Sequence, residues 1–196
     1  HMLALPILVA SLTLIFFNPQ TLRQMAFAIA FLIFLVPPPT EILYGIGANL
    51  SVLTSEASCA IVKAFGIPSA IINEYGNPSI VITRPNGTTL PFAIDIACSG
   101  IYSLIGFAVF AVLIVYVIRG KLWKKLSLAV LGIPLLYLLN IIRITTILLM
   151  GYYFGAEIAL QIFHLIGGWV LILAGTLLLL LLSEKGFKTQ IFASPA

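Results

Sequence analysis

The chain has 196 residues, of which 61% are hydrophobic and only 8% are charged. Soluble domains carry about 25% charged residues, so this sequence cannot cover a water-facing surface and is that of an integral membrane protein. Its net charge of +4 is too small to indicate a nucleic-acid-binding protein.

The first two apolar runs predict a helical hairpin across the membrane. Leu3–Phe17 lacks the basic start and the cleavage site of a signal peptide, so we interpret it as a span. Residues 18–23 are predicted to form a short turn. The second run, Gln24–Val36, is ended by three prolines at 37–39, because proline cannot continue a helix. Residues 3–36 are therefore predicted as an N-terminal helical hairpin.

Residues 41–65 have helical periodicity but are interrupted by polar side chains. These are Glu41, Asn49, Ser51, Thr54, Ser55, Glu56, Ser58 and Lys63. That mixture favours an interfacial or protein-covered helix. A further membrane crossing is the alternative.

Residues 66–97 form a polar insert with the pattern of β-strands. Ile80–Thr83 is β-branched, Arg84–Gly87 is a turn signal, and Thr88–Ile96 alternates between apolar and other residues. The pattern predicts a small two- or three-stranded antiparallel cap outside the membrane.

Three more apolar runs, Cys98–Ile118, Leu126–Gly151 and Glu157–Leu182, follow the insert. Basic residues gather in 119–125 and again after the last run, and such residues accumulate on the cytoplasmic side. The run that starts with Cys98 therefore begins at the outer face. The predicted fold class is an all-α membrane bundle with about five spans, or six if residues 41–65 cross the membrane.

Cys98 lies where the polar insert meets a long apolar helix. In the first turn of that helix, free backbone N–H groups and the helix dipole favour the thiolate, which is the nucleophilic form. The alternative is a small buried cysteine. Asp95 either orients a base or caps the following helix, and the cap is favoured. Ser99 either packs between helices or contacts an oxyanion, and packing is favoured.

Arg143 interrupts the second of these runs. A guanidinium costs several kcal/mol in lipid, so it must face the protein interior or water. Asn140 lies on the same helical face. Arg143 either forms a structural ion pair with Asp95 or Glu157 or binds an anion or oxyanion, and the second interpretation is favoured.

His164 lies in the last run, on one helical face with Glu157 and Gln161. His164 and Arg143 are each seven residues from the expected outer ends of their helices, a rise of about 10 Å. Both are therefore expected at one depth, below Cys98, where His164 suits general acid–base chemistry.

No metal site or cofactor is expected. The sequence has one interior histidine and no cluster of His, Cys and carboxylate residues with ligand spacing. The second cysteine, Cys59, has no base near it in the sequence and is expected to take no part in chemistry.

Three motifs resemble the exosortase/archaeosortase family of membrane-embedded cysteine transpeptidases, which act like sortases. They are Ala-Cys-Ser-Gly-Ile at 97–101, Asn-Ile-Ile-Arg-Ile at 140–144, and His164 in the last span. The resemblance covers most of residues 37–183. It implies that Cys98 is the nucleophile, His164 the proton shuttle and Arg143 the group that stabilises the transition state. Residues 98–183 would then form a catalytic three-helix core.

The resemblance also implies the substrates. They are exported proteins with a C-terminal signal made of a short motif, a transmembrane helix and a basic tail. Cleavage would occur at the outer face of the cytoplasmic membrane of a prokaryote, with transfer to a membrane acceptor, a lipid in particular. The compact chain favours the archaeal branch. Two alternatives are a hydrolytic membrane cysteine protease and a non-catalytic transporter or assembly subunit.

Overall fold

The structure is a computed structural model that describes residues 4–74, 76–117, 121–165, 169–170 and 172–178. Its internal contacts divide the chain into two units, His1–Ile42 and Leu43–Ala196. The second unit contains Cys98, Asn140 and Arg143.

The first unit holds two helices that pack on each other, α1 (Ala4–Phe16) and α2 (Pro19–Phe31), followed by the 3₁₀ helix η1 (Leu32–Leu35). The prediction of a turn over residues 18–23 was wrong, because α2 already begins at Pro19. Asn18 accepts a hydrogen bond from the Thr21 backbone N–H at 2.8 Å. Asparagine followed by proline favours the start of a helix as strongly as it favours a turn.

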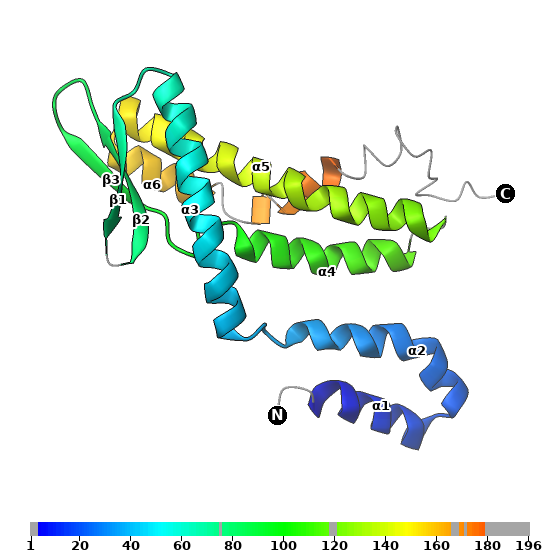
Figure 1. Cartoon of the computed structure of the whole chain (residues 1–196). Helices are drawn as coiled ribbons and strands as arrows, with labels where there is room; N and C mark the ends of the chain where they lie inside the picture. Colours follow the sequence, from blue (N-terminus) through cyan, green and yellow to red (C-terminus); the bar gives the residue numbers. More distant parts are fainter. Residues whose placement is uncertain (1–3, 75, 118–120, 166–168, 171, 179–196) are drawn as a thin grey trace. The chain divides into compact units, whose positions relative to one another are not determined.

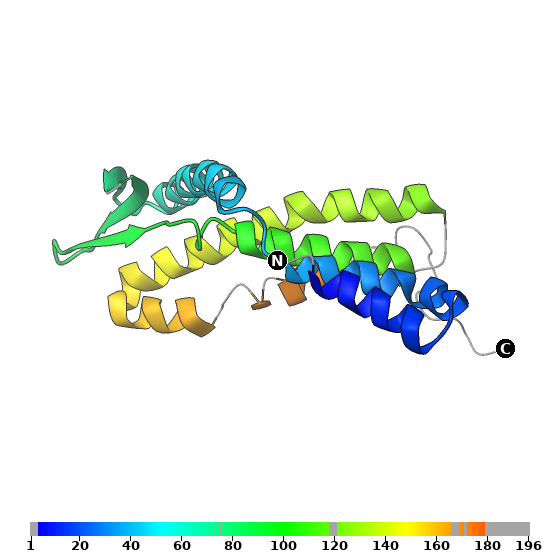
Figure 2. The same ribbon diagram turned by 90° about the horizontal axis from the view of Figure 1, so that it is seen from below.

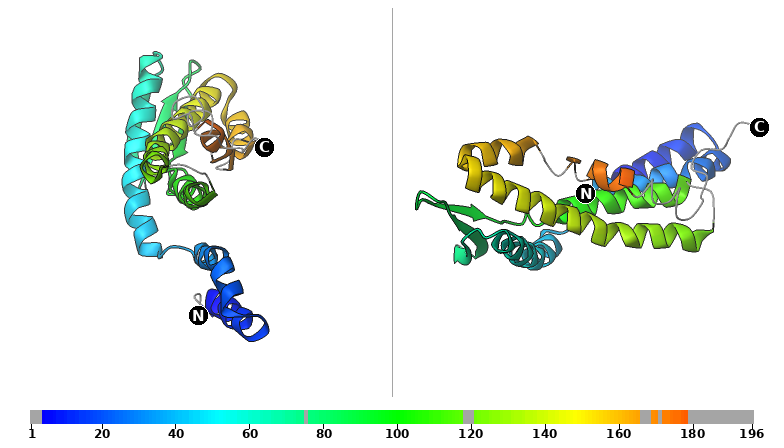
Figure 3. Two further views of the ribbon diagram at one scale, coloured as in Figure 1. Left: turned by 90° about the vertical axis from the view of Figure 1, so that its right-hand side faces the viewer. Right: turned by 90° about the horizontal axis from the view of Figure 1, so that it is seen from above.

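The helix predicted over residues 41–65 is confirmed as α3 (Thr40–Ala64). Its Ser51, Thr54, Ser55 and Ser58 side chains are buried, as expected of a protein-covered helix. The Thr54 hydroxyl lies 3.4 Å from the Tyr137 hydroxyl, so this face of α3 packs across the helix that contains Arg143. Figure 3 shows α3 alongside that helix and the β-sheet.

The polar insert contains a three-stranded antiparallel sheet in the order β1 (Ser69–Glu74), β2 (Asn77–Thr83), β3 (Thr89–Ala93). This agrees with the predicted strands. Ile80 and Ile82 of β2 and Ile94 just after β3 are buried in one core cluster with the C-terminal part of α5 (Leu122–Phe154). Phe92 of β3 lies close to Gly151, where a Cβ would be 2.5 Å from the Phe92 ring.

The remaining described helices are α4 (Ile101–Val117), α5 and α6 (Ala156–Leu165). Helices α4 and α5 lie side by side and antiparallel (Figures 1 and 2), and α6 packs back on α5. Helix α5 begins at Leu122, so the basic residues Lys124 and Lys125 belong to this helix. Lys125 donates its Nζ to the Val115 carbonyl of α4 at 2.9 Å, which satisfies a carbonyl at the end of that helix.

The last predicted span, 157–182, is only partly described. Residues 156–165, 169–170 and 172–178 are helical, and the rest of that span lies outside the described residues. Among the described helices, α3 and α5 are long and apolar enough to cross a membrane, while α1, Pro19–Leu35 and α4 are shorter apolar helices. The number of spans stays a prediction.

Two glycines of α3 test how tightly this helix packs. A Cβ on Gly47 would lie 2.6 Å from Ile96, whereas a Cβ on Gly45 would meet nothing within 4 Å. Gly47→Ala should lower the stability by about 1–3 kcal/mol through overpacking. Gly45→Ala should raise it by up to about 1 kcal/mol through helix propensity. Thermal unfolding of both variants in detergent measures the difference, and a Gly47→Ala protein as stable as wild type would contradict the packing of α3 on Ile96.

Candidate active site

Cys98 lies in a tight turn between β3 and α4. Its backbone N–H donates to both the carbonyl oxygen and the Oδ1 of Asp95, each at 3.0 Å. The turn ends at Gly100, whose φ of +89° suits glycine. Helix α4 then begins at Ile101. Asp95 therefore caps the cysteine turn, and the expectation that Cys98 sits in the first turn of the helix was wrong.

Burial and the neighbouring Asp95 both favour the protonated form of the Cys98 thiol. Its side chain is only 7% exposed. Burial, followed by the negative charge of Asp95 and a hydrogen bond to it, raises the pKa of the Cys98 thiol to about 12, although the Arg143 guanidinium acts in the opposite direction. This corrects the expected thiolate, because the Cys98 N–H is already bonded to Asp95 and the dominant effect is the cost of burying charge. Nucleophilic attack by this thiol would therefore require a base.

Asn140 of α5 joins the cysteine turn to Arg143. Its Nδ2 donates to the Cys98 carbonyl at 3.1 Å, and its Oδ1 accepts from Arg143 at 3.4 Å. Asn140 is 1% exposed. A Cβ at Gly100 would lie 3.0 Å from the Asn140 side chain, so glycine also permits this close approach.

Arg143 is buried within the protein, as the cost of a guanidinium in lipid requires. Arg143 bonds to Asn140, and Asn140 bonds to the Cys98 carbonyl, so a single side chain separates Arg143 from the turn that carries Cys98. Arg143 lies 11 residues before the end of α5 at Phe154, since the helix continues beyond the expected end at Met150. It is therefore about 16 Å below that end of the helix, deeper than expected.

His164 lies in α6, and its side chain is outside the described part of the structure. Its position in the helix is four residues after Leu160, which lines a cavity next to Cys98. Residues four apart share a helical face. The backbone thus brings position 164 toward the same side of the bundle, and the role of His164 stays a prediction.

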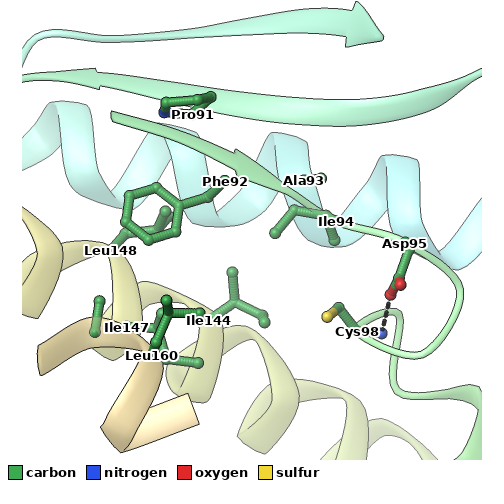
Figure 4. A pocket seen from close by; sticks show the side chains of 11 residues that line it. Pro91, Phe92, Ala93, Ile94, Asp95, Cys98, Ile144, Ile147, Leu148 and Leu160 are labelled. Carbon is green, nitrogen blue, oxygen red and sulfur yellow. Dashed lines mark hydrogen bonds between the residues drawn. The ribbon is translucent and has the colours of Figure 1, made fainter. Parts of the chain in front are cut away.

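The cavity next to Cys98 has a volume of about 270 Å³. Its walls come from β3 and the residues after it, the C-terminal part of α5 and the start of α6. The lining residues are Pro91, Phe92, Ala93, Ile94, Asp95, Cys98, Ile144, Ile147, Leu148, Ala159 and Leu160. Figure 4 shows Phe92 and Ile94 above α5 and the Cys98 sulfur directed toward Ile144. The thiol therefore faces an apolar space.

The other candidate residues have structural contacts. Ser99 donates its hydroxyl to the Ile96 carbonyl at 2.7 Å and accepts from the Ile101 N–H at 3.3 Å, so it stabilises the turn. Cys59 is buried, and its sulfur lies 3.4 Å from the Ser69 hydroxyl. Both cysteines are free thiols. Within the described residues, no group of three or more His, Cys, Asp or Glu side chains has the arrangement of a metal site.

Arg84 is a positioning residue that the sequence analysis missed. It follows β2, and its Nε donates to the Tyr152 carbonyl at the end of α5 at 3.0 Å. The Arg84 guanidinium is also near Gly155, where α5 turns into α6. A basic residue in a turn signal gives no hint of such a partner, because the partner is a backbone carbonyl 68 residues away.

A family model of transmembrane exosortases matches residues 1–181. The chain belongs to the transmembrane exosortase family. The match confirms the resemblance inferred from the three motifs. The family consists of membrane-embedded cysteine peptidases and transpeptidases. No curated protein and no solved structure matches the chain.

The raised pKa of Cys98 predicts how the thiol reacts with iodoacetamide, which consumes only the thiolate. The rate should rise about tenfold per pH unit between pH 7 and 10, because the pKa of about 12 lies above that range. Asp95→Asn removes the negative charge but keeps a capping oxygen. It should lower the pKa of Cys98 and speed alkylation at pH 8 by about three- to tenfold.

Mass spectrometry of the Cys98 peptide measures this rate, with Cys59 as the internal reference. Glu56→Gln is the matched control, because Glu56 is an exposed carboxylate on α3. Alkylation of Cys98 that is unchanged or slower in Asp95→Asn would contradict the effect of Asp95 on the thiol.

Proposed function

We propose that the protein is a cysteine transpeptidase of the cytoplasmic membrane. It cleaves C-terminal sorting signals of exported proteins at the outer face and transfers the new C-terminus to a membrane acceptor, a lipid with a nucleophilic group. The observation that carries this proposal is the buried Cys98 thiol at an apolar cavity, linked through Asn140 to Arg143. The exosortase match supports it.

The chemistry divides into two steps. His164 takes the Cys98 proton as the sulfur attacks a peptide carbonyl, and Arg143 stabilises the negative charge that develops on the oxygen. The C–N bond then breaks, the leaving amine receives the proton, and the substrate remains on Cys98 as a thioester. The acceptor nucleophile attacks the thioester and releases the thiol.

A resting thiol with a raised pKa fits this order of events. The Cys98 thiol stays protonated until a base is placed beside it, so it reacts only slowly with solutes in the absence of substrate. The apolar walls of Ile144, Ile147 and Leu148 keep water away from the thioester. This favours transfer to a membrane acceptor over hydrolysis.

The distribution of charge supports an outward-facing site. Lys121, Lys124 and Lys125 lie where α5 begins, at the opposite end of α4 from Cys98. Basic residues mark the cytoplasmic side of membrane helices, so the cysteine turn, the sheet and the α5–α6 junction belong at the outer side. The basic tail of a substrate signal would remain on the cytoplasmic side.

The test is co-expression with a reporter protein that carries a motif, a transmembrane helix and a basic tail at its C-terminus. Cys98→Ala and Cys98→Ser should abolish processing, His164→Ala should lower it at least 100-fold, and Cys59→Ala should process normally. Mass spectrometry of the reporter's new C-terminus distinguishes the outcomes.

An added lipid mass on the reporter establishes transfer, whereas a free carboxylate shows a hydrolytic protease. Processing that persists in Cys98→Ala would overturn the assignment of the nucleophile. The non-catalytic transporter or assembly subunit would then be the better interpretation.

A further inference from the structure

Strand β3 is an edge strand whose outer side carries main-chain groups near Cys98. Among the described strands it pairs with β2 alone. The ladder bonds run through alternate residues, as shown by Ile94 N–H to Pro78 O at 2.9 Å and Arg84 N–H to Thr88 O at 2.8 Å. In an antiparallel pair the intervening residues direct their N–H and C=O groups away from the partner. Pro91 and Ala93 are such residues, and within the described chain no backbone partner faces them.

The same stretch leads directly to the nucleophile. Pro91 and Ala93 line the cavity that contains Cys98, and the chain continues through Asp95 into the cysteine turn. Figure 4 shows β3 running over the cavity toward Asp95 and Cys98. A peptide aligned with this edge would therefore run toward the sulfur atom.

The cavity has the size and polarity for side chains of a peptide. Its volume of about 270 Å³ is below the roughly 300–1,000 Å³ of most small-molecule sites. Successive side chains of an extended strand point to opposite faces. A strand added to β3 would direct every second side chain toward the Ile147 and Leu160 walls, which accept apolar groups.

We propose that the substrate's recognition segment binds as an added β-strand on the free edge of β3 at Pro91 and Ala93. Main-chain hydrogen bonds hold the peptide, apolar side chains at alternate positions enter the cavity, and the scissile carbonyl reaches Cys98 about two residues, or about 7 Å, beyond Ala93. This rests on the proposed function, to which it adds the chemistry of substrate recognition.

Pro91 limits the length of this pairing. Proline on an edge strand protects against unwanted strand addition, because it lacks a donor. Here the proline removes the N–H donor of residue 91. The Pro91 carbonyl and both main-chain groups of Ala93 remain available to pair with a peptide. Only a short peptide segment at the Cys98 end can then form the full set of bonds, which fixes its register relative to the thiol.

The test uses the full chain in detergent and a probe that alkylates Cys98. The probe is an N-acetyl tetrapeptide chloromethyl ketone of alanine and leucine residues, from which the thiolate displaces chloride. Its analogue is N-methylated at alternate amides, and iodoacetamide reports the intrinsic reactivity of the thiol. Each alkylation rate is divided by the rate with iodoacetamide. After this division, the peptide should alkylate Cys98 at least tenfold faster than its N-methylated analogue does.

Ala93→Pro should remove at least four-fifths of that advantage, which is calculated relative to the rate of the same variant with iodoacetamide. Thr89→Pro is the matched control, because its N–H also faces outward but Thr89 does not line the cavity. A tetrapeptide that reaches Cys98 spans about 13 Å and does not extend to Thr89, so this variant should keep the full advantage.

Equal rates for the peptide and its N-methylated analogue on the wild-type protein would overturn strand addition, and this comparison needs no variant to fold. An advantage that survives in Ala93→Pro would overturn it as well. Failure of the proposed function is recognised separately, as reporter processing that continues without Cys98.

Discussion

The buried amide of Asn140 is the contact on which the geometry of the site depends. It donates to the Cys98 carbonyl and accepts from Arg143, so one side chain connects the turn before α4 with the charged group of α5. A buried amide left without partners would cost about 1–3 kcal/mol. Gly100 makes the contact possible, because its positive φ and the absence of a Cβ allow the turn to approach Asn140.

A protonated thiol and a deeply placed arginine form a consistent resting state. The pKa of Cys98 is raised mainly by burial and then by Asp95, so the sulfur carries no negative charge before substrate arrives. In the proposed mechanism, charge develops on the oxygen of a bound peptide carbonyl near Arg143, where electrostatic stabilisation would be strong because water is scarce. Asp95 thus serves the turn and keeps the thiol in its unreactive form.

Much of this arrangement was readable from the sequence. The β-branched run at 80–83 and the period-two alternation of 88–96 predicted β2 and β3. The polar side chains of residues 41–65 indicated a helix with one covered face, and Ser55 and Ser58 are buried in α3. The spacing of Asn140 and Arg143 placed them on one face, and Ile144 and Leu148 continue it toward the cavity. That stripe was a usable signal for the cavity wall.

Other features depend on contacts that a pattern does not contain. Helix α4 begins at Ile101 because Gly100 has a positive φ. In the sequence alone, a glycine after a Cys-Ser pair is equally compatible with a helix that has already started. The sign of the Cys98 pKa shift depends on burial by α5 and on the distance to Asp95, which only the folded chain defines. The bond from Arg84 to Tyr152 joins distant segments in the same way.

The most direct test of this account is to compare Asn140→Ala with Asn49→Ala, since the exposed amide of Asn49 donates to the Gly45 carbonyl of its own helix. Loss of Asn140 should release the cysteine turn, so Cys98 should react faster with iodoacetamide while reporter processing falls at least tenfold. Asn49→Ala should change neither rate. Normal processing in Asn140→Ala, with an unchanged rate of Cys98 alkylation, would contradict the claim that Asn140 holds the thiol and Arg143 in one site.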